Sequence, residues 1–364
     1  MTVRTVAVVG AGLAGARTAE TLRAAGFDGR LVLIGDEPVA PYERPALSKE
    51  FLTGRRDEES LLLRPHAFWR ERAVELRLAT RVTRVDAAER TLVTSKGGTL
   101  RFDQLVVATG ARPRRLPLEL PAGVHELRTL ADARALREEL APGVRLVVVG
   151  GGFVGAEAAS SARSLGVEVT IVEAAPAPVA RVLGDTVGLV LAERWRRHGV
   201  DVRLGVGLAH ARADAAGRVT SLLLTNGEEL RADVVLVGVG VQPAAELLPG
   251  RPATHVHAAG DVTGSGHWTA AALDGAAAAR RILGLPEQPR PPAYVWSDQF
   301  GLRLQVVGTP RPDDVLAVDG GGDSFAVAYL DETGAPHAGV FANRPAEAAA
   351  LRRALADGAL ALAA

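Results

Sequence analysis

The stretch "TVAVVGAGLAGARTAETLRAAG" (residues 5–26) decides the fold of this chain. Residues 6–9 form an apolar run of strand length, and Gly10, Gly12 and Gly15 follow with the spacing G-x-G-x-x-G. The next residues keep helical spacing up to Gly26. Glycines at this spacing permit a tight turn, close approach of the backbone to a pyrophosphate, and close packing of the helix on the strand. The pattern therefore predicts a strand, a turn and a helix that together bind a dinucleotide.

A second strand, "RLVLIGDE" (residues 30–37), completes this first unit. We expect it to end at Asp36 and Glu37, the distance at which such units place an acid that accepts from a ribose hydroxyl. The phosphate charge would lie at the helix N-terminus, where free N–H groups and the helix dipole favour it.

The whole unit is repeated in "VRLVVVGGGFVGAEAASSARSLGVEVTIVEAAP" (residues 144–176). Its helix stops at Gly166, its last strand ends at Glu173, and its turn glycines are Gly150, Gly152 and Gly155. One glycine-rich turn is weak evidence, but two complete copies predict an α/β fold with two dinucleotide sites. The natural pair of dinucleotides is FAD and a nicotinamide cofactor. The charge of Glu173 would repel a 2′-phosphate, which favours NADH over NADPH, although Arg181 lies near enough in sequence to weaken that preference.

Further strands and turns fit the same fold. The stretches "LVVATGARPRRLP" (residues 105–117) and "ADVVLVGVGVQP" (residues 232–243) are buried strands that run into glycine- and proline-rich turns, and they resemble two crossings between domains. Asp261 follows a short strand in "HAAGDVT", and a helix begins near Trp268 and Thr269, where its dipole would favour negative charge on a flavin. We therefore predict an FAD-binding domain at 1–112 and 243–288, an NADH-binding domain at 113–242, and an interface domain at 289–364.

Composition restricts the function. The 364 residues carry 42 Lys and Arg against 42 Asp and Glu, and this balance argues against a protein that coats nucleic acid or a membrane surface. No apolar run reaches the roughly 18 residues that a spanning helix needs, and the chain begins without a signal-peptide pattern, so we expect a soluble cytoplasmic protein. Cysteine is absent, which excludes disulfides, thiolate metal ligands and thiol catalysis within this sequence. The eight histidines lack metal-ligand spacing, and no metal site is predicted.

Several longer motifs make the chain resemble one group of flavoprotein reductases. They include "PYERPALSK" (residues 41–49), "ATGARPR" (residues 108–114), "GGGFVGAEAA" (residues 150–159), "HWTAA" (residues 267–271), "YVWSDQFGLRLQVVG" (residues 294–308) and "FANRPAE" (residues 341–347). The chain resembles the oxygenase-coupled NADH-dependent ferredoxin reductases, the group of putidaredoxin reductase and rhodocoxin reductase. This resemblance implies a glutathione-reductase-like fold of two Rossmann-like domains with a small C-terminal α+β domain.

The resemblance also implies roles for particular residues. Arg44 would contact the phosphate–ribose region of FAD, and Lys49 would lie beside the flavin, paired with Glu157 of the second helix. Lys49 and Glu157 are thus the candidate catalytic residues, the alternative being a surface lysine and an unrelated helix glutamate. Trp296 would face the flavin, and Tyr294 stands where relatives often have a second tryptophan.

The complete set of expected binding residues follows from the motifs and the resemblance together. For FAD these are Gly10, Gly12, Leu13, Ala14, Gly15, Asp36, Glu37, Arg44, Lys49, Val82, Ala108, Thr109, Gly110, Arg128, Gly260, Asp261, Trp268, Thr269, Ala270 and Trp296. For NADH they are Gly150, Gly152, Phe153, Val154, Gly155, Glu157, Glu173, Arg181, Gly238, Val239 and Gly240.

The resemblance implies an FAD-dependent NADH:ferredoxin reductase. Its 2Fe–2S ferredoxin would bind transiently through opposite charges and would supply a haem-thiolate monooxygenase or a Rieske oxygenase. Without a cysteine, electrons would leave the flavin directly. Alternatives are a signalling NADH-binding flavoprotein similar to apoptosis-inducing factor, a quinone or rubredoxin reductase, or a scaffold without FAD. The chain departs from the group at Ala46, where relatives have a second proline, and in a shortened stretch at residues 244–261.

Overall fold

The computed structural model describes residues 3–311 and 314–358 as two compact units. The first unit comprises Met1–Glu43, Glu58–Arg112 and Val241–Arg290, and the second comprises Arg44–Asp57, Pro113–Gly240 and Pro291–Ala364. The outermost ends of the predicted domains (residues 1–2 and 359–364) and residues 312–313 lie outside the described residues. Within the described ranges, no helix combines the length and the apolar character needed to cross a bilayer.

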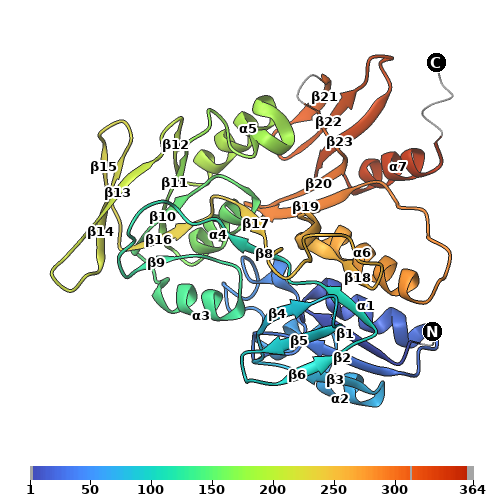
Figure 1. Cartoon of the computed structure of the whole chain (residues 1–364). Helices are drawn as coiled ribbons and strands as arrows, with labels where there is room; N and C mark the ends of the chain where they lie inside the picture. Colours follow the sequence, from blue (N-terminus) through green and yellow to red (C-terminus); the bar gives the residue numbers. More distant parts are fainter. Residues whose placement is uncertain (1–2, 312–313, 359–364) are drawn as a thin grey trace. The chain divides into compact units, whose positions relative to one another are not determined.

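The first unit is built on a five-stranded parallel sheet with the order β18-β7-β1-β2-β3. These strands are β1 (Thr5–Val9), β2 (Arg30–Ile34), β3 (Val74–Arg77), β7 (Gln104–Val107) and β18 (Val256–Ala258). Helices α1 (Leu13–Ala24) and α6 (Trp268–Ile282) pack together on one face of the sheet (Figure 1). Strand side chains alternate between faces, so Val6 and Val8 of β1 enter this helix-covered core.

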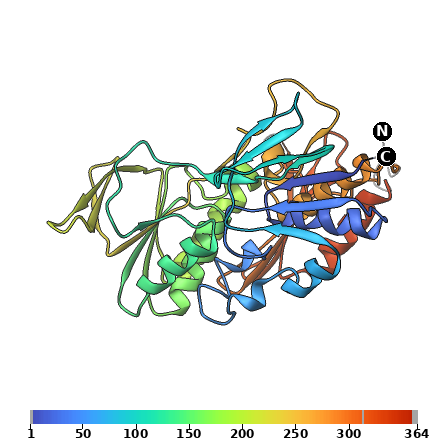
Figure 2. The same ribbon diagram turned by 60° about the horizontal axis from the view of Figure 1, so that its bottom comes forward.

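The opposite face of the same sheet is covered by a smaller antiparallel sheet (Figure 2). Ala7 and Val9 of β1 pack there against Leu92 and Leu100. The covering strands are β4 (Val82–Asp86), β5 (Thr91–Thr94) and β6 (Thr99–Arg101). The unit also contains α2 (His66–Glu71), the 3-10 turns η2 (Glu59–Leu61) and η3 (Gly260–Thr263), strand β17 (Val241–Pro243), and the first two residues of its pairing strand β8 (Ala111–Pro113).

The strand predicted to run to Asp36 and Glu37 ends earlier than expected. β2 stops at Ile34, and the N–H of the next residue, Gly35, donates to the carbonyl of Arg77 at 2.9 Å. Asp36 and Glu37 therefore lie in a bend beyond the sheet. The helix that follows the first glycine turn begins and ends close to its predicted positions.

The second unit contains the other parallel sheet, with the order β12-β11-β10-β16-β9. Its strands are β9 (Val124–His125), β10 (Arg145–Val149), β11 (Glu168–Glu173), β12 (Asp201–Leu204) and β16 (Val234–Val237). The predicted strand end at Glu173 is confirmed. The accompanying helices are α3 (Leu130–Glu139), α4 (Phe153–Ser164) and α5 (Ala180–Arg197), and strands β13 (Leu208–Ala213), β14 (Val219–Leu224) and β15 (Glu229–Arg231) form a separate antiparallel sheet (Figure 1).

The predicted antiparallel sheet and helix near the C-terminal end are present in this second unit. The sheet has the order β19-β20-β23-β22-β21, and helix α7 (Pro345–Ala356) follows it. Its strands are β19 (Tyr294–Gln299), β20 (Leu302–Gly308), β21 (Val315–Gly321), β22 (Ser324–Leu330) and β23 (Pro336–Ala342). One hydrophobic core joins this sheet to α4 and α5 through Trp195, Leu302 and Tyr329. The hydroxyl of Tyr329 also donates to the carbonyl of Leu183 at 2.6 Å.

The segment "PYERPALSKEFL" (residues 41–52) crosses from the first unit to the second at Arg44. It forms the 3-10 turn η1 (Arg44–Ala46) and then a series of turns. Leu52 enters the hydrophobic core of the second unit, and the guanidinium of Arg137 lies 5.4 Å from the ring centroid of Phe51. Apolar anchors thus hold an irregular path, which places Ser48 and Lys49 inside the second unit.

Candidate functional site

The outer two glycines of the first turn are required by the fold. Gly10 has φ +116°, and a Cβ there would lie 2.0 Å from the carbonyl oxygen of Ala108. A Cβ on Gly15 would lie 2.0 Å from the carbonyl oxygen of Gly10. Gly12 differs, because its φ is −89° and no described heavy atom lies within 4 Å of a Cβ placed there. The backbone at Gly12 therefore faces open space that a ligand can enter.

The second turn has the same division of roles. Gly150 has φ +111°, and its Cβ would lie 2.5 Å from the carbonyl oxygen of Gly238; a Cβ on Gly155 would lie 2.3 Å from the oxygen of Gly150. Gly152 has φ −76° and, among the described atoms, no neighbour within 4 Å of its Cβ position. Helices α1 and α4 begin directly after Gly12 and Gly152, and because these N-cap residues are glycines, neither supplies a capping side chain. Both turns therefore fit a bound dinucleotide phosphate.

The acids of the two turns are held differently. Asp36 is 62% exposed and lies 3.8 Å from the guanidinium of Arg81, while the carboxylate of Glu37 accepts from the hydroxyl of Tyr42 at 2.7 Å. Glu173 accepts from the backbone N–H of Gly151 at 2.7 Å and from that of Ala175 at 2.8 Å. Glu173 is thus fixed beside its glycine turn, whereas Asp36 extends into solvent.

The predicted contact between Lys49 and Glu157 is present in the second unit. The ammonium Nζ of Lys49 lies 3.1 Å from Oε1 of Glu157, and the two side chains are 10% and 6% exposed. This burial rules out the alternative of a surface lysine and an unrelated helix glutamate. A buried charge of either sign is costly unless it is paired and hydrogen-bonded. Two residues that sequence reasoning did not assign supply the further bonds, since the hydroxyls of Ser48 and Ser297 donate to Glu157 at 2.6 and 2.8 Å.

A weak signal for these serines exists in the sequence. Ser297 and Gln299 alternate with Trp296 along β19, and both are buried although polar. Polar residues on the buried face of a strand need partners inside the protein. Their partners are distant in sequence, 140 residues away in the case of Ser297 and Glu157, so the alternation alone could not identify them.

The remaining residues of the first unit that are expected to bind FAD gather at one edge of its parallel sheet. They follow the carboxyl ends of β7 and β18 or begin α6, and they are Ala108, Thr109, Gly110, Gly260, Asp261, Trp268, Thr269 and Ala270. A Cβ on Gly260 would lie 2.8 Å from the Cβ of Ala14 in α1, so this loop touches the first glycine-turn helix. The hydroxyl of Thr109 donates to the carbonyl of Ala244 at 2.7 Å. Val82 begins β4 and is buried.

Four expected FAD residues belong to the second unit: Arg44, Lys49, Arg128 and Trp296. The guanidinium of Arg44 donates to the carbonyl of Arg128 at 2.6 Å, so the structure brings these two residues together. Trp296 stacks on Tyr294 with ring centroids 6.2 Å apart. Because side chains alternate along a strand, Trp296 and Tyr294 lie on the face of β19 opposite Ser297.

The expected NADH residues surround the second glycine turn. Gly238 N–H donates to the carbonyl of Val149 at 2.8 Å, and Val239 and Gly240 follow it after β16. Phe153 and Val154 are the first residues of α4. Val179 N–H donates to the carbonyl of Gly151 at 3.2 Å, which ties the start of α5 to the turn, and Arg181 lies exposed in the first turn of that helix.

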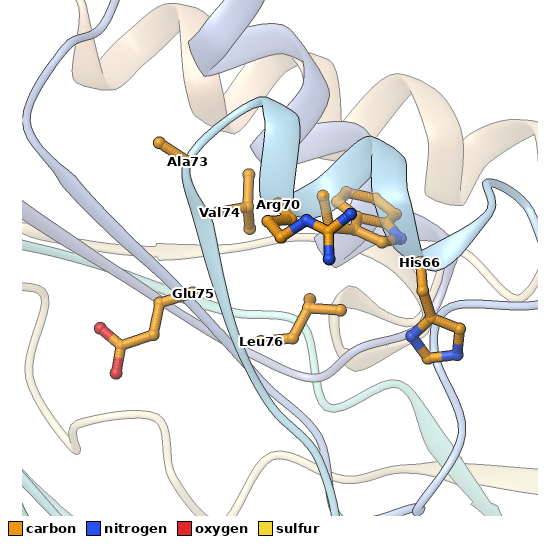
Figure 3. A pocket seen from close by; sticks show the side chains of 7 residues that line it. His66, Arg70, Ala73, Val74, Glu75 and Leu76 are labelled. Atoms are coloured by element: carbon orange, nitrogen blue, oxygen red, sulfur yellow. The ribbon is translucent and has the colours of Figure 1, made fainter.

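A surface hollow in the first unit lies among residues outside both predicted sets (Figure 3). It is formed by α2 and β3 and lined by His66, Trp69, Arg70, Ala73, Val74, Glu75 and Leu76. The buried indole N–H of Trp69 has no hydrogen-bond partner among the described residues. The hollow is separate from the glycine turns, and we assign it no role in the candidate site.

Comparison with known proteins agrees with this geometry. The sequence profile of pyridine nucleotide-disulphide oxidoreductases matches residues 4–275, and that of reductase C-terminal domains matches residues 294–364. A ferredoxin–NAD(P)(+) reductase of Sphingomonas sp. is 36% identical over 359 residues, covering 89% of this chain and 86% of the relative. The ferredoxin–NAD(+) reductase component of the p-cumate 2,3-dioxygenase system of Pseudomonas putida is 36% identical over 383 residues, covering 96% and 92%.

A solved structure is similar over nearly the whole chain. It is the putidaredoxin reductase of a covalent putidaredoxin reductase–putidaredoxin complex, with a TM-score of 0.93 and 30% sequence identity. The match covers 97% of this chain and 93% of that one. The alignment with the Pseudomonas putida relative spans 383 positions, more than the 364 residues of this chain, so that relative carries insertions that this chain lacks.

Proposed function

Since the chain belongs to the pyridine nucleotide-disulphide oxidoreductase family, and within it to the ferredoxin–NAD(P)(+) reductases, we propose that it passes electrons from NADH through FAD to a 2Fe–2S ferredoxin of an oxygenase system. The observation that carries the proposal is the pair of glycine turns. In each turn the middle glycine, Gly12 or Gly152, has neither a positive φ nor a close neighbour among the described atoms that would require glycine. A ligand that approaches the backbone there explains both glycines.

FAD would be held in the first unit by the turn at Gly10–Gly15, with the loops after β7 and β18 and the start of α6 beside it. Bound there, FAD would supply the chemistry that accepts a hydride equivalent and releases electrons singly. The N-terminus of α6, at Trp268 and Thr269, is the positive end of a 15-residue helix dipole and would favour negative charge on the bound flavin. NADH would be held by the turn around Gly152 and by Glu173.

Lys49 and Glu157 would orient the nicotinamide end of NADH. Their side chains are buried together, and the carboxylate of Glu157 also accepts hydrogen bonds from the hydroxyls of Ser48 and Ser297. A pair fixed in this way is a preorganised polar group, which positions a bound ring without moving during the reaction. Neither residue is needed as a general base, because hydride transfer moves no proton at the carbon that reacts.

The preference for NADH rests on Glu173. Its carboxylate is held by two backbone N–H groups at the end of β11, where a ribose hydroxyl would bind and a 2′-phosphate would be repelled. Arg181 lies outside this hydrogen-bond arrangement, on the exposed first turn of α5.

The test is an anaerobic titration of the purified, FAD-containing protein with NADH. We expect the visible flavin absorption to bleach, and added oxidised 2Fe–2S ferredoxin with an acidic surface to restore it under continued anaerobiosis. Flavin absorption that persists after excess NADH would overturn the reductase assignment. Bleaching with a stable long-wavelength charge-transfer band and no turnover with ferredoxin would instead favour a slow NADH-binding flavoprotein.

A further inference from the structure

A row of buried side chains leads from the core of the second unit to Glu157. The indole Nε1–H of Trp195 donates to Oε1 of Gln299 at 2.7 Å, and Nε2 of Gln299 donates to the hydroxyl of Ser297 at 3.1 Å. The hydroxyl of Ser297 then donates to Oε1 of Glu157 at 2.8 Å. The four residues are between 0% and 5% exposed.

The direction of every hydrogen bond in this row is fixed by its first member. An indole N–H can only donate, so Gln299 must turn its carbonyl oxygen towards Trp195 and its NH₂ towards Ser297. The hydroxyl of Ser297 then accepts from Gln299, and its single proton is directed to Glu157. The row is therefore satisfied only when Glu157 presents an acceptor oxygen, as a carboxylate does.

The two ends of the row have different surroundings: one end is packed among apolar groups and the other belongs to an ion pair. Trp195 is fully buried in α5, and its ring lies 6.3 Å from that of Phe300 in the same hydrophobic core. Glu157 is the residue that meets Lys49. Its other oxygen, Oε2, accepts from Ser48, whose own carbonyl accepts from Ser161 at 2.7 Å. Packed groups thus set the position of Glu157 from the side of β19 as well as from the side of the Lys49 turn.

We propose that Ser297, Gln299 and Trp195 are positioning residues, which hold the Glu157 carboxylate in one orientation beside Lys49 and so make strand β19 part of the reduction site. The proposal rests on the proposed function, because it assumes that the Lys49–Glu157 pair acts on bound NADH. The proposal gives the C-terminal sheet a role besides packing. Strand β19 carries Trp296 on one face, and Ser297 on its other face orients the Glu157 carboxylate of the ion pair with Lys49.

The first experiment measures flavin reduction by NADH in stopped flow. Ser297→Ala removes the hydroxyl, and we expect the limiting rate of reduction to fall about tenfold, since a hydrogen bond to a charged group is lost. The dissociation constant for NADH should change less than about twofold. Ser297→Thr keeps a hydroxyl on a strand, where β-branched residues fit, and should restore most of the rate.

Ser221→Ala is the matched control. Ser221 is also buried, belongs to the same unit, and donates to a glutamate, Glu229, at 2.6 Å. Glu229 is 42% exposed, and loss of this bond should leave the rate of flavin reduction unchanged. If Ser297→Ala does not fold, Gln299→Met is the alternative. It removes the N–H donor that orients the hydroxyl of Ser297, and it should lower the rate of flavin reduction in the same way.

The second experiment does not depend on turnover. The chain has four tryptophans, so protein labelled with ¹⁵N-tryptophan gives four indole N–H signals, and Trp195→Phe identifies the one from Trp195. We expect Ser297→Ala to shift this signal and to speed its hydrogen exchange, and Ser221→Ala to leave it in place. If Ser297→Ala changes neither the chemical shift nor the hydrogen exchange of the Trp195 indole, the four residues are not coupled and the proposal is wrong.

The two hypotheses fail in different ways. If the wild-type flavin is reduced by NADH but Ser297→Ala is reduced at the wild-type rate, the positioning role is wrong and the reductase function stands. If NADH does not reduce the wild-type flavin, the reductase function is wrong, and so is any positioning role in it, while the indole signals still decide whether the row is coupled.

Discussion

The two glycine turns share one backbone frame but differ in what covers their helices. Gly10 and Gly150 have nearly the same φ, and each is closed in by a carbonyl oxygen from the neighbouring strand end. The fifth residue of the first helix is Arg17, which is 39% exposed and pairs with Glu20. The fifth residue of the second helix is Glu157, which is buried against Lys49. Equivalent positions therefore carry a surface charge in one unit and a buried ion pair in the other.

The packing partners explain the difference. Helix α1 meets α6 through small residues, and a Cβ on Gly275 would lie 2.2 Å from the carbonyl oxygen of Ala14. Helix α4 instead meets the irregular turn that carries Lys49 and the buried polar face of β19. On the proposed function, the glycine pattern would set where a nucleotide phosphate binds, and the element packed on the helix would decide whether its side chains take part in the reaction.

The largest expected effect tests the shared frame. Gly10→Ala and Gly150→Ala would force a methyl group into a backbone carbonyl at positive φ, and each should lower the free energy of unfolding by at least about 4 kcal/mol or prevent folding. Gly26→Ala is the control, because Gly26 also has a positive φ of +86° but no described atom within 4 Å of its Cβ. It should cost only about 1 kcal/mol. Denaturant unfolding measures all three, and equal losses would show that φ alone, and not the close carbonyl, demands the glycines.

The next effect tests the difference between the helices. Glu157→Ala leaves the ammonium group of Lys49 buried without its partner and should cost about 3 kcal/mol in denaturant unfolding. Arg17→Ala, at the equivalent position of α1, should cost less than about 0.5 kcal/mol, because Arg17 is 39% exposed and its partner Glu20 keeps a second ion pair with Arg64 at 2.9 Å. The double variant Lys49→Met with Glu157→Leu should recover part of the loss. Similar costs for Glu157→Ala and Arg17→Ala would remove the distinction drawn between the two helices.

A third prediction compares the acids that follow the turns. Glu173→Ala removes a fixed negative charge, and the affinity for NADPH relative to NADH should rise about tenfold, or about 1.4 kcal/mol. Glu168→Ala, at the exposed start of the same strand, is the control and should leave the ratio unchanged. If Glu173→Ala weakens both cofactors equally, the carboxylate serves only to hold Gly151 and Ala175.

A fourth prediction concerns the ion pair between Arg145 and Asp233, at the end of the second parallel sheet opposite the glycine turn. The guanidinium of Arg145 lowers the pKa of Asp233 from 3.8 to about 2 by a side-chain hydrogen bond, against burial, which raises it. A carboxylate with a lowered pKa stabilises the fold above the unfolded pKa, and this contribution is lost as the pH falls from about 4 towards 2. Both side chains are more than a third exposed, so Asp233→Asn should cost only about 1 kcal/mol at pH 7.

Unfolding at several pH values tests this. The difference in stability between the wild type and Asp233→Asn should be constant above about pH 5 and should shrink below pH 4. A difference that persists unchanged to pH 3 would assign the effect to the amide itself. Asp103 precedes β7 in the first unit as Asp233 precedes β16 in the second, and its carboxylate accepts from the backbone N–H groups of Arg4 and Thr5.

The sequence predicted the frame well and the side-chain partners poorly, for physical reasons. The outer glycines of both turns were predictable because a close carbonyl, with positive φ at Gly10 and Gly150, leaves only glycine, a requirement visible at fixed spacing. The end of β2 could not be predicted in this way. It depends on the pairing of β2 with β3, which ends at Ile34 and Arg77, and β3 lies far along the chain. The contact of Lys49 with Glu157 came from resemblance to a family. The hydrogen bonds of Ser48 and Ser297 to Glu157 could not be predicted, because a serine carries no local signal of a partner more than 100 residues away.

The smallest expected effect on stability is also the one that separates fold from binding. Gly12→Ala and Gly152→Ala add a methyl group at negative φ where no described atom is within 4 Å. Alanine is a poorer N-cap than glycine, which destabilises the helix, but it also lowers the entropy of the unfolded chain, which stabilises the fold. Because these two effects nearly cancel, the free energy of unfolding of each variant should stay within about 0.5 kcal/mol of the wild-type value.

The same methyl group would occupy the space of a phosphate, and affinity should fall at least about tenfold, each variant affecting its own cofactor. Gly12→Ala should purify with less FAD, and Gly152→Ala should keep its FAD but require more NADH to bleach it. If Gly152→Ala binds NADH normally, the middle glycine of the second turn has no ligand to accommodate, and the two turns are alike in form but not in use.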